Sequence, residues 1–187
     1  MSVTETLNPA LPAGQPACWQ SEPSVGGSLA DWLLSDRLMT PDMQRSLAHP
    51  IAINVLREEF VPAPVDVAAL IEDCPSELWL REIVMRANGV LLVHALCFAT
   101  AATLKKHLWL KTLGDRPLGG QLATLDGVAR THMSFCAAAQ LHGDLASKAG
   151  PGAWARRSVF ELQGSKLVLI EHMSADLTTS ARLTDDH

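Results

Sequence analysis

The chain has 187 residues, of which 48% are hydrophobic, so it is long enough to enclose one sizeable core. Its formal net charge of -5 and lack of a concentrated basic cluster exclude a general polyanion binder, because phosphate backbones attract clustered Lys and Arg. No run reaches the roughly 18 apolar residues of a membrane span, and the first twenty residues lack the pattern of an export signal. We therefore expect a cytoplasmic protein without a nucleic-acid partner or a membrane span.

The domain organisation follows from composition along the chain. Residues 1–26 are rich in Pro, Gly, Ser and Ala and predict a flexible lead-in, residues 27–174 form one continuous domain, and residues 175–187 form a polar tail. The four cysteines are scattered without a CxxC pair, which predicts reduced structural thiols: Cys18, Cys74, Cys97 and Cys136.

Three helices are predicted from capping patterns. Ser28 is a candidate N-cap for an apolar helix that ends near Leu34, and Thr40 precedes a Pro at the start of a second short helix. Residues 101–113 carry a helical pattern, with lysines in the last turns and Gly114 as the C-cap.

Six segments have the β-branched and apolar character of strands. They are residues 51–60, 77–87, 90–99, 129–138, 154–162 and 166–173. Asn88-Gly89 and Gln163-Gly164-Ser165 predict tight hairpin turns between neighbouring segments. The fold class is therefore predicted as α+β, with a single antiparallel sheet of about six strands and helices on one side.

Two charges share strand faces with apolar residues. Because side chains alternate across a strand, Arg81 lies with Trp79 and Ile83, and Glu171 lies with Leu169. A buried charge needs a partner. Either the two residues pair with each other or lie at a sheet edge, or they line a pocket in which the guanidinium binds a carboxylate and the carboxyl group handles a hydroxyl or a proton.

Other candidates have weaker support. Arg156 and Arg157 are adjacent in a strand, so one guanidinium is expected to point inward and the other outward. No HxH, HExxH or CxxC spacing supports zinc, and no GxSxG, P-loop or GxGxxG motif is present. The sequence therefore gives no support for a zinc site, an α/β-hydrolase, an NTPase or a dinucleotide-binding protein.

Several spaced motifs occur in one order and together resemble the chorismate pyruvate-lyase family. They are Asp31-Trp32-Leu33-Leu34 with Met39-Thr40, Arg57-Glu58, Trp79-Leu80-Arg81-Glu82-Ile83, Leu113-Gly114 with Pro117-Leu118-Gly119, Trp154-Ala155-Arg156-Arg157-Ser158 and the strand of Glu171. The resemblance runs from about residue 29 to residue 174.

This resemblance implies an antiparallel sheet with two helical flaps over a buried pocket. It also implies cleavage of chorismate to 4-hydroxybenzoate and pyruvate, the first step of ubiquinone biosynthesis, in a monomer and without a cofactor. Carried over by motif, Met39 and Leu118 contact the ligand through their backbones, Arg81 binds the ring carboxylate and Glu171 binds the ring hydroxyl end. Arg81 and Glu171 are the implied catalytic residues.

The sequence departs from the family pattern at Leu96, where the pattern has an Arg in a Gly-Arg-Thr-Val-x-Pro-like run. We expect this departure to remove one contact to a dicarboxylate. Two alternatives to the lyase stay open: a divergent enzyme acting on a related cyclic acid, and a non-catalytic protein of the same fold that binds an aromatic carboxylate.

Overall fold

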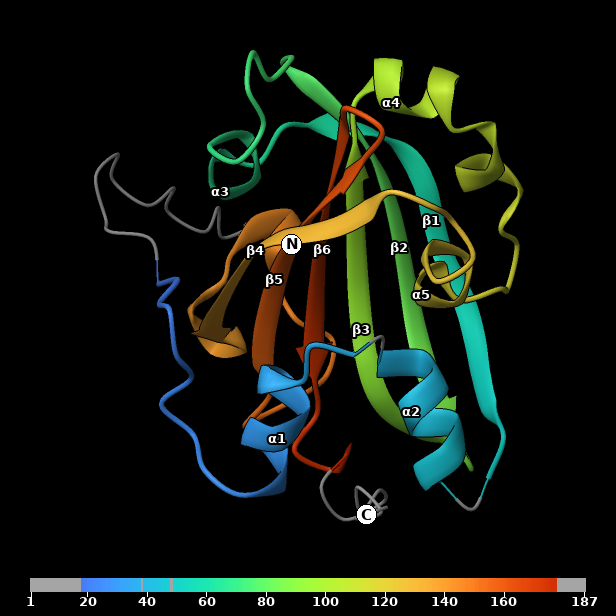
Figure 1. Ribbon diagram of the computed structural model, residues 1–187. Helices are drawn as coiled ribbons and strands as arrows, with labels where there is room; N and C mark the ends of the chain where they lie inside the picture. The colour runs from blue at the N-terminus through green and yellow to red at the C-terminus, as the bar shows by residue number, and fades with distance from the viewer. Residues whose placement is uncertain (1–17, 38, 48, 178–187) are drawn as a thin grey trace, which may run out of the picture.

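The computed structural model describes residues 18–37, 39–47 and 49–177, and these form a single sheet with short helices around it (Figure 1). The sheet has six antiparallel strands in the order β1-β2-β3-β6-β5-β4. Their bounds are β1 Ile51–Pro62, β2 Glu77–Ala87, β3 Val90–Ala99, β4 Val128–Ala137, β5 Trp154–Leu162 and β6 Ser165–Met173. The predicted α+β class with one antiparallel sheet is confirmed.

Both predicted hairpin turns are present. Asn88 and Gly89 have φ values of 48° and 79°, and Gln163 and Gly164 have φ values of 48° and 77°. Positive φ at both central residues is the backbone of a two-residue turn whose twist matches the flanking strands. These turns pair β2 with β3 and β5 with β6, so they set which side chains lie opposite each other in the centre of the sheet.

Three helices lie on the near face of the sheet in Figure 1: α1 Ser28–Leu34, α2 Met39–Ser46 and α5 Leu118–Leu122. The predicted N-caps are wrong. Gly27, with φ of 69°, is the N-cap of α1, so Ser28 is already helical. Thr40 lies inside α2, which begins one residue earlier.

The helix predicted over residues 101–113 is interrupted. Helix α4 spans Ala101–Lys106, and the 3-10 helix η1 spans Leu108–Thr112. His107 separates them with φ of -121° and ψ of 66°, outside the helical region. Gly114 follows with φ of 57°, which is the left-handed conformation expected of a C-terminal glycine.

The far face of the sheet is covered as well, by short segments that the sequence did not predict. Helix α3 Val65–Ala68 and the 3-10 helices η2 Ala138–Gln140 and η3 Gly143–Leu145 lie there. Val67 and Leu145 pack in one apolar cluster with Leu80 and Leu96. The reason is that β2 and β3 are buried on both faces, so each face requires a cover.

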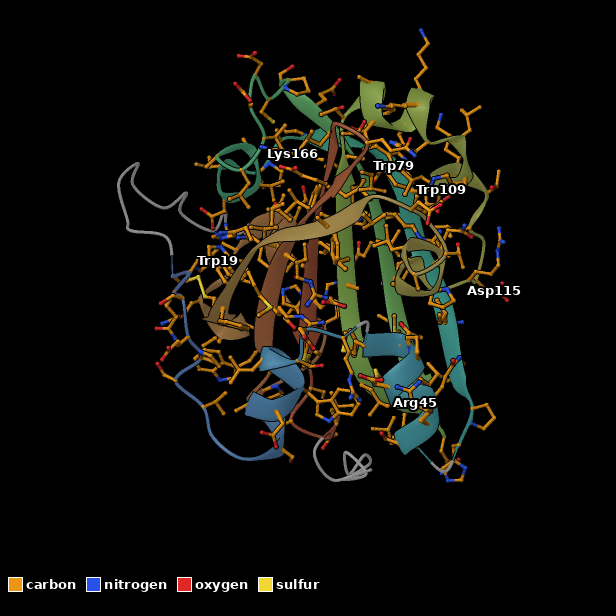
Figure 2. The ribbon with its side chains drawn as sticks, viewed as in Figure 1. Trp19, Arg45, Trp79, Trp109, Asp115 and Lys166 are labelled. Carbon is orange, nitrogen blue, oxygen red and sulfur yellow. A yellow bond between two sulfur atoms is a disulfide. The ribbon has the colours of Figure 1, made fainter. Side chains whose placement is uncertain are left out.

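Part of the predicted lead-in is attached to the sheet. Cys18 forms a disulfide with Cys136, which corrects the prediction of reduced thiols for this pair, while Cys74 and Cys97 are free. A β-bridge between Gln20 and its partner on β4 brings the two cysteines together. Figure 2 shows the disulfide close to Trp19.

Trp19 strengthens this attachment. Its indole Nε1 donates to Asp66 over 3.1 Å, and the guanidinium of Arg157 lies 4.3 Å from its ring centroid. At the other end, Leu177 is fully buried although it belongs to the predicted polar tail. Residues 1–17 and 178–187, which make up most of the two predicted segments, lie outside the described residues.

A buried polar chain crosses three strands on the far face. His94 Nε2 donates to Glu82 over 2.9 Å, and its Nδ1 accepts from the Lys148 backbone N–H over 3.1 Å and lies 3.1 Å from Nδ1 of His172. Burial alone would raise the pKa of Glu82, but hydrogen bonds from Lys148, Arg57 and His94 lower it to about 2. Burial, followed by the proximity of His94, lowers the pKa of His172 to about 3.

The lowered pKa of His172 predicts acid destabilisation. Above about pH 6.5 neither state is protonated at this residue; below it the unfolded chain binds a proton that the folded chain does not, so the free energy of unfolding falls towards pH 3. His172→Asn keeps a donor in place of Nδ1 and does not titrate. The slope of the free energy of unfolding against pH, measured by denaturant unfolding between pH 4.5 and 6.5, should therefore be smaller in this variant than in the wild type by about one proton per chain. The exposed His142→Asn should keep the wild-type slope, and equal slopes in all three proteins would contradict this account.

The disulfide predicts a thiol count. Protein unfolded without reductant should expose two thiols per chain, those of Cys74 and Cys97, and reduction should raise the count to four. A thiol-reactive chromophore measures both values. Four thiols in the purified, unreduced protein would show that Cys18 and Cys136 are not bonded.

Candidate functional site

A cavity opens on the near face of the sheet, beneath α2 and α5. Its lining is mainly apolar, its polar side chains are those of Thr40, Arg130 and Glu171, and Gly119 contributes backbone only. The apolar members are Met39, Ile83, Met85, Ala95, Leu118, Leu122, Phe160 and Leu169. A mostly apolar cavity with a few converging polar groups is the usual form of a small-ligand site.

Glu171 is held by a buried ion pair with Arg156. These residues are direct partners on β6 and β5, and Nε and Nη2 of Arg156 donate to Oε2 of Glu171 over 2.9 and 2.8 Å. Arg156 is fully buried and Glu171 is 7% exposed. Oε1 of Glu171 accepts no hydrogen bond from any described residue, so one carboxylate oxygen is anchored and the other is available to a ligand in the cavity.

Arg156 also ties the end of α1 to the site. Its Nη1 donates to the main-chain oxygens of Ser35 over 2.8 Å, Trp32 over 3.3 Å and Leu33 over 3.4 Å. The last carbonyls of a helix lack partners within it, and a cation there is favoured by the helix dipole. Helix α1 has no basic residue in its last turn, so Arg156 of β5 supplies that charge.

Arg130 is a second cation at the cavity. Its Nη1 donates to the carbonyls of Ser35 and Asp36 over 3.2 and 3.1 Å, and Nη2 donates to that of Arg37 over 3.4 Å. Its guanidinium lies 5.1 Å from the Phe160 ring centroid. Together with Arg156, Arg130 fixes the connection between α1 and α2.

Arg81 and Glu171 do not pair with each other and neither lies on an edge strand, but each has an ion-pair partner of its own. Arg81 instead pairs with Glu58, its direct partner on β1, and donates from Nη2 to the Gly114 carbonyl over 2.6 Å and that of Arg116 over 3.4 Å. Arg81 is 2% exposed. Its Nε–H has no hydrogen-bond partner among the described residues.

Of the four predicted ligand contacts, Met39, Leu118 and Glu171 line the one cavity. Met39 is the first residue of α2, and Leu118 is the first residue of α5 after Pro117, so two short helices deliver their N-terminal residues to the same space. Arg81 is not among the lining residues, although it shares the cavity face with Ile83 of the same strand.

Leu96 lies on the opposite face of the sheet from the cavity, which corrects the expectation that it removes a ligand contact. Counting from the Ala87↔Val90 pair at the turn would place Leu96 opposite Arg81. A bulge beyond Met85 shifts the register by one residue, so Leu96 is paired with Glu82 and packs in the far-face core. His94 lies on that far face as well.

Sequence reasoning missed Arg130 for a similar reason. Alternation counted back from Phe135 and Met133 places Arg130 on the far face. A bulge at Thr131 returns it to the cavity face, opposite Phe160. Bulges are frequent beside active sites because they re-aim a side chain. Arg156 and Arg157 do lie on opposite faces as predicted, but both are buried.

The fold and the cavity define a small α+β protein with a mostly apolar cavity of the kind that binds small organic ligands. The family model of chorismate lyase matches residues 13–180, and the chain belongs to that family. Chorismate pyruvate-lyase of Erwinia tasmaniensis is 35% identical over 176 residues, which cover 90% of each chain. That of Citrobacter koseri is 32% identical over 152 residues, covering 80% of this chain and 84% of the relative.

Among solved structures, the ligand-binding domain of a GntR-family transcriptional regulator from Bordetella bronchiseptica is similar with a TM-score of 0.50. The match covers 74% of this chain and 90% of that chain at 14% identity, so it shows the fold alone. In the part of the chain that the structure describes, no helix is long and apolar enough to cross a membrane, and no group of three or more His, Cys, Asp or Glu side chains is placed to hold a metal.

The buried ion pair predicts an asymmetric response to mutation. Arg156→Met leaves Glu171 buried without its partner and the α1 carbonyls without donors, so it should lower the free energy of unfolding by about 3–5 kcal/mol. The double variant Arg156→Met/Glu171→Leu removes the stranded charge and should recover part of that loss. Denaturant unfolding measures all three proteins. A double variant no more stable than Arg156→Met would contradict the ion-pair account.

Proposed function

We propose that this chain converts chorismate to 4-hydroxybenzoate and pyruvate. The observation that carries the proposal is the anchored carboxylate of Glu171, which has one free oxygen in an apolar cavity that Met39 and Leu118 also line. Membership of the chorismate lyase family and the relatives named chorismate pyruvate-lyase support it.

The reaction is an elimination that makes the ring aromatic. The ring carbon that bears the hydroxyl loses its hydrogen as a proton, and the neighbouring carbon loses the enolpyruvyl oxygen. The electrons of the broken C–H bond form the new ring double bond, and the released enolpyruvate takes a proton on its methylene carbon to become pyruvate. No electrons are exchanged with another reagent, so the residues have to supply positioning and stabilisation of developing charge.

Glu171 is proposed to bind the ring hydroxyl through Oε1. Because Arg156 donates twice to Oε2, the carboxylate is held in one orientation, and its Oε1 accepts a hydrogen bond from the hydroxyl without reorganising. The hydroxyl is attached to the carbon that loses hydrogen, so this contact fixes the reacting carbon in the cavity. The backbones of Met39 and Leu118 close over the ring from α2 and α5.

Arg81 is proposed to bind the ring carboxylate at the other pole. Its Nη groups are fixed by Glu58 and the Gly114 carbonyl, which leaves Nε–H for the ligand. Burial supports this role, because a guanidinium at 2% exposure interacts strongly with an anion. Cys97, its cross-strand partner, is buried and has a pKa raised to about 12, so it stays protonated and does not compete as a charged group.

We further infer that the chain acts as a cytoplasmic monomer at the first step of ubiquinone biosynthesis and needs no cofactor. The proposed substrate is a small dicarboxylate, and the proposed aromatic product is a monocarboxylate. The Cys18–Cys136 disulfide is unusual for that compartment, because a glutathione pool keeps most cytoplasmic cysteines as thiols.

The test is turnover of chorismate by the purified protein, followed as 4-hydroxybenzoate and pyruvate in equal amounts. Glu171→Gln should lower kcat by roughly 10- to 150-fold, as expected for loss of a hydrogen bond to a charged group. Arg81→Ala should lower kcat/KM by roughly 10- to 150-fold, as expected for loss of a charged hydrogen bond. Arg86→Ala, on the same strand but outside the cavity lining, is the matched control and should retain activity.

Absence of turnover by the wild type would reject the lyase. Unchanged turnover in Glu171→Gln and Arg81→Ala would reject the assigned residues. Binding of 4-hydroxybenzoate without any turnover would instead support the non-catalytic binding protein of the same fold.

A further inference from the structure

Arg130 lines the cavity without a carboxylate partner among the described residues. Arg81 pairs with Glu58, and Arg156 pairs with Glu171. Arg130 donates only to main-chain carbonyls and to the sulfur of Met133. Since a partly buried cation is costly unless an opposite charge compensates it, the cavity has one positive charge available for an anionic ligand.

This charge lies at the Glu171 end of the cavity. The Ser35 carbonyl accepts from Nη1 of Arg130 over 3.2 Å and from Nη1 of Arg156 over 2.8 Å, so the two guanidinium groups meet at one oxygen. Arg156 in turn holds Glu171. Burial first, and then the charge of Arg156, lower the pKa of Arg130, and the charges of Glu171 and Asp36 offset only part of this lowering.

One donor of Arg130 is unused. Its Nε is buried and has no hydrogen-bond partner, whereas its Nη groups are fixed on the connection between α1 and α2. An unpaired buried donor is unfavourable, and an ionised donor forms short, strong hydrogen bonds with carboxylates. The guanidinium is therefore held in place with Nε–H ready for an anionic acceptor.

We propose that Arg130 binds the carboxylate of the enolpyruvyl side chain and thereby selects a dicarboxylate substrate over the monocarboxylate product. This inference rests on the proposed function. The ether oxygen is attached beside the carbon that bears the hydroxyl, so a ring whose hydroxyl meets Glu171 places its side chain at the same end as Arg130. The ring carboxylate is then at the opposite pole, at Arg81. Release of pyruvate leaves Arg130 without an anion, so the aromatic product gains nothing from this residue.

The experiment compares substrate and product in Arg130→Met and Arg130→Lys. Arg130→Met should lower kcat/KM for chorismate by roughly 10- to 150-fold, mainly through KM, while the Kd of 4-hydroxybenzoate measured by calorimetry changes by less than about threefold. Arg130→Lys keeps the positive charge but lacks the planar set of donors of a guanidinium, so it should recover part of the lost kcat/KM.

The matched control is Arg86→Met. Arg86 is a cation on β2 that lies outside the cavity lining and has no ion-pair partner among the described residues. This variant should leave both constants unchanged, which separates the local contact from the general loss of one positive charge.

Two results would overturn the proposal. If Arg130→Met weakens the binding of 4-hydroxybenzoate as much as that of chorismate, the residue acts only by holding the connection between α1 and α2. If kcat/KM for chorismate is unchanged, no contact exists. Should the wild type fail to turn over chorismate, the proposed function fails, but the ratio of the Kd values of chorismate and 4-hydroxybenzoate still decides the role of Arg130: an unchanged ratio in Arg130→Met rejects it.

Discussion

A carboxylate that lies inside a mostly apolar cavity and therefore needs a partner there is the constraint on which this structure depends. Arg156 supplies two hydrogen bonds to Glu171 and also donates to the last carbonyls of α1. One buried guanidinium thus joins strands β5 and β6 to helix α1. The carboxylate keeps a single orientation with one oxygen free, which is the arrangement that a hydroxyl-bearing ligand requires. A buried pair of this kind contributes little net stability, so its value lies in the geometry that it imposes.

The far face of the sheet supports the site without touching it. Glu82 follows Arg81, and His172 follows Glu171, so members of the far-face polar chain alternate with residues of the cavity face along β2 and β6. His94 on β3 links the two and completes a connection across three strands. Slippage of any of these strands by one residue would exchange the two faces and bury unpaired charges on both sides. The polar chain therefore keeps the cavity residues in phase.

The sequence allowed much of this architecture to be predicted, because hairpin turns and alternation are local. Strands β2, β3 and β5 begin and end where expected, and Arg81 and Glu171 lie on the cavity face. Their partners could not be predicted, since Glu58 and Arg156 are brought to them by strand pairing between distant segments. The disulfide between Cys18 and Cys136 depends on a bridge to β4 that no local pattern encodes. Single extra residues in β3 and β4 decide that Arg130 faces the cavity and that Leu96 faces away from it, so neither position could be predicted by counting along the strand.

These bulges have a consequence for comparing this chain with its relatives. Alternate residues of a strand lie on opposite faces of the sheet, and an inserted residue exchanges the two faces from that point onward. An ungapped comparison across Leu92 or Thr131 therefore matches residues of one face with residues of the other whenever the second chain lacks the insertion. Two residues of different family members are therefore equivalent only if their side chains lie on the same face of the sheet. A substitution should be transferred from one member to another only after that face has been checked.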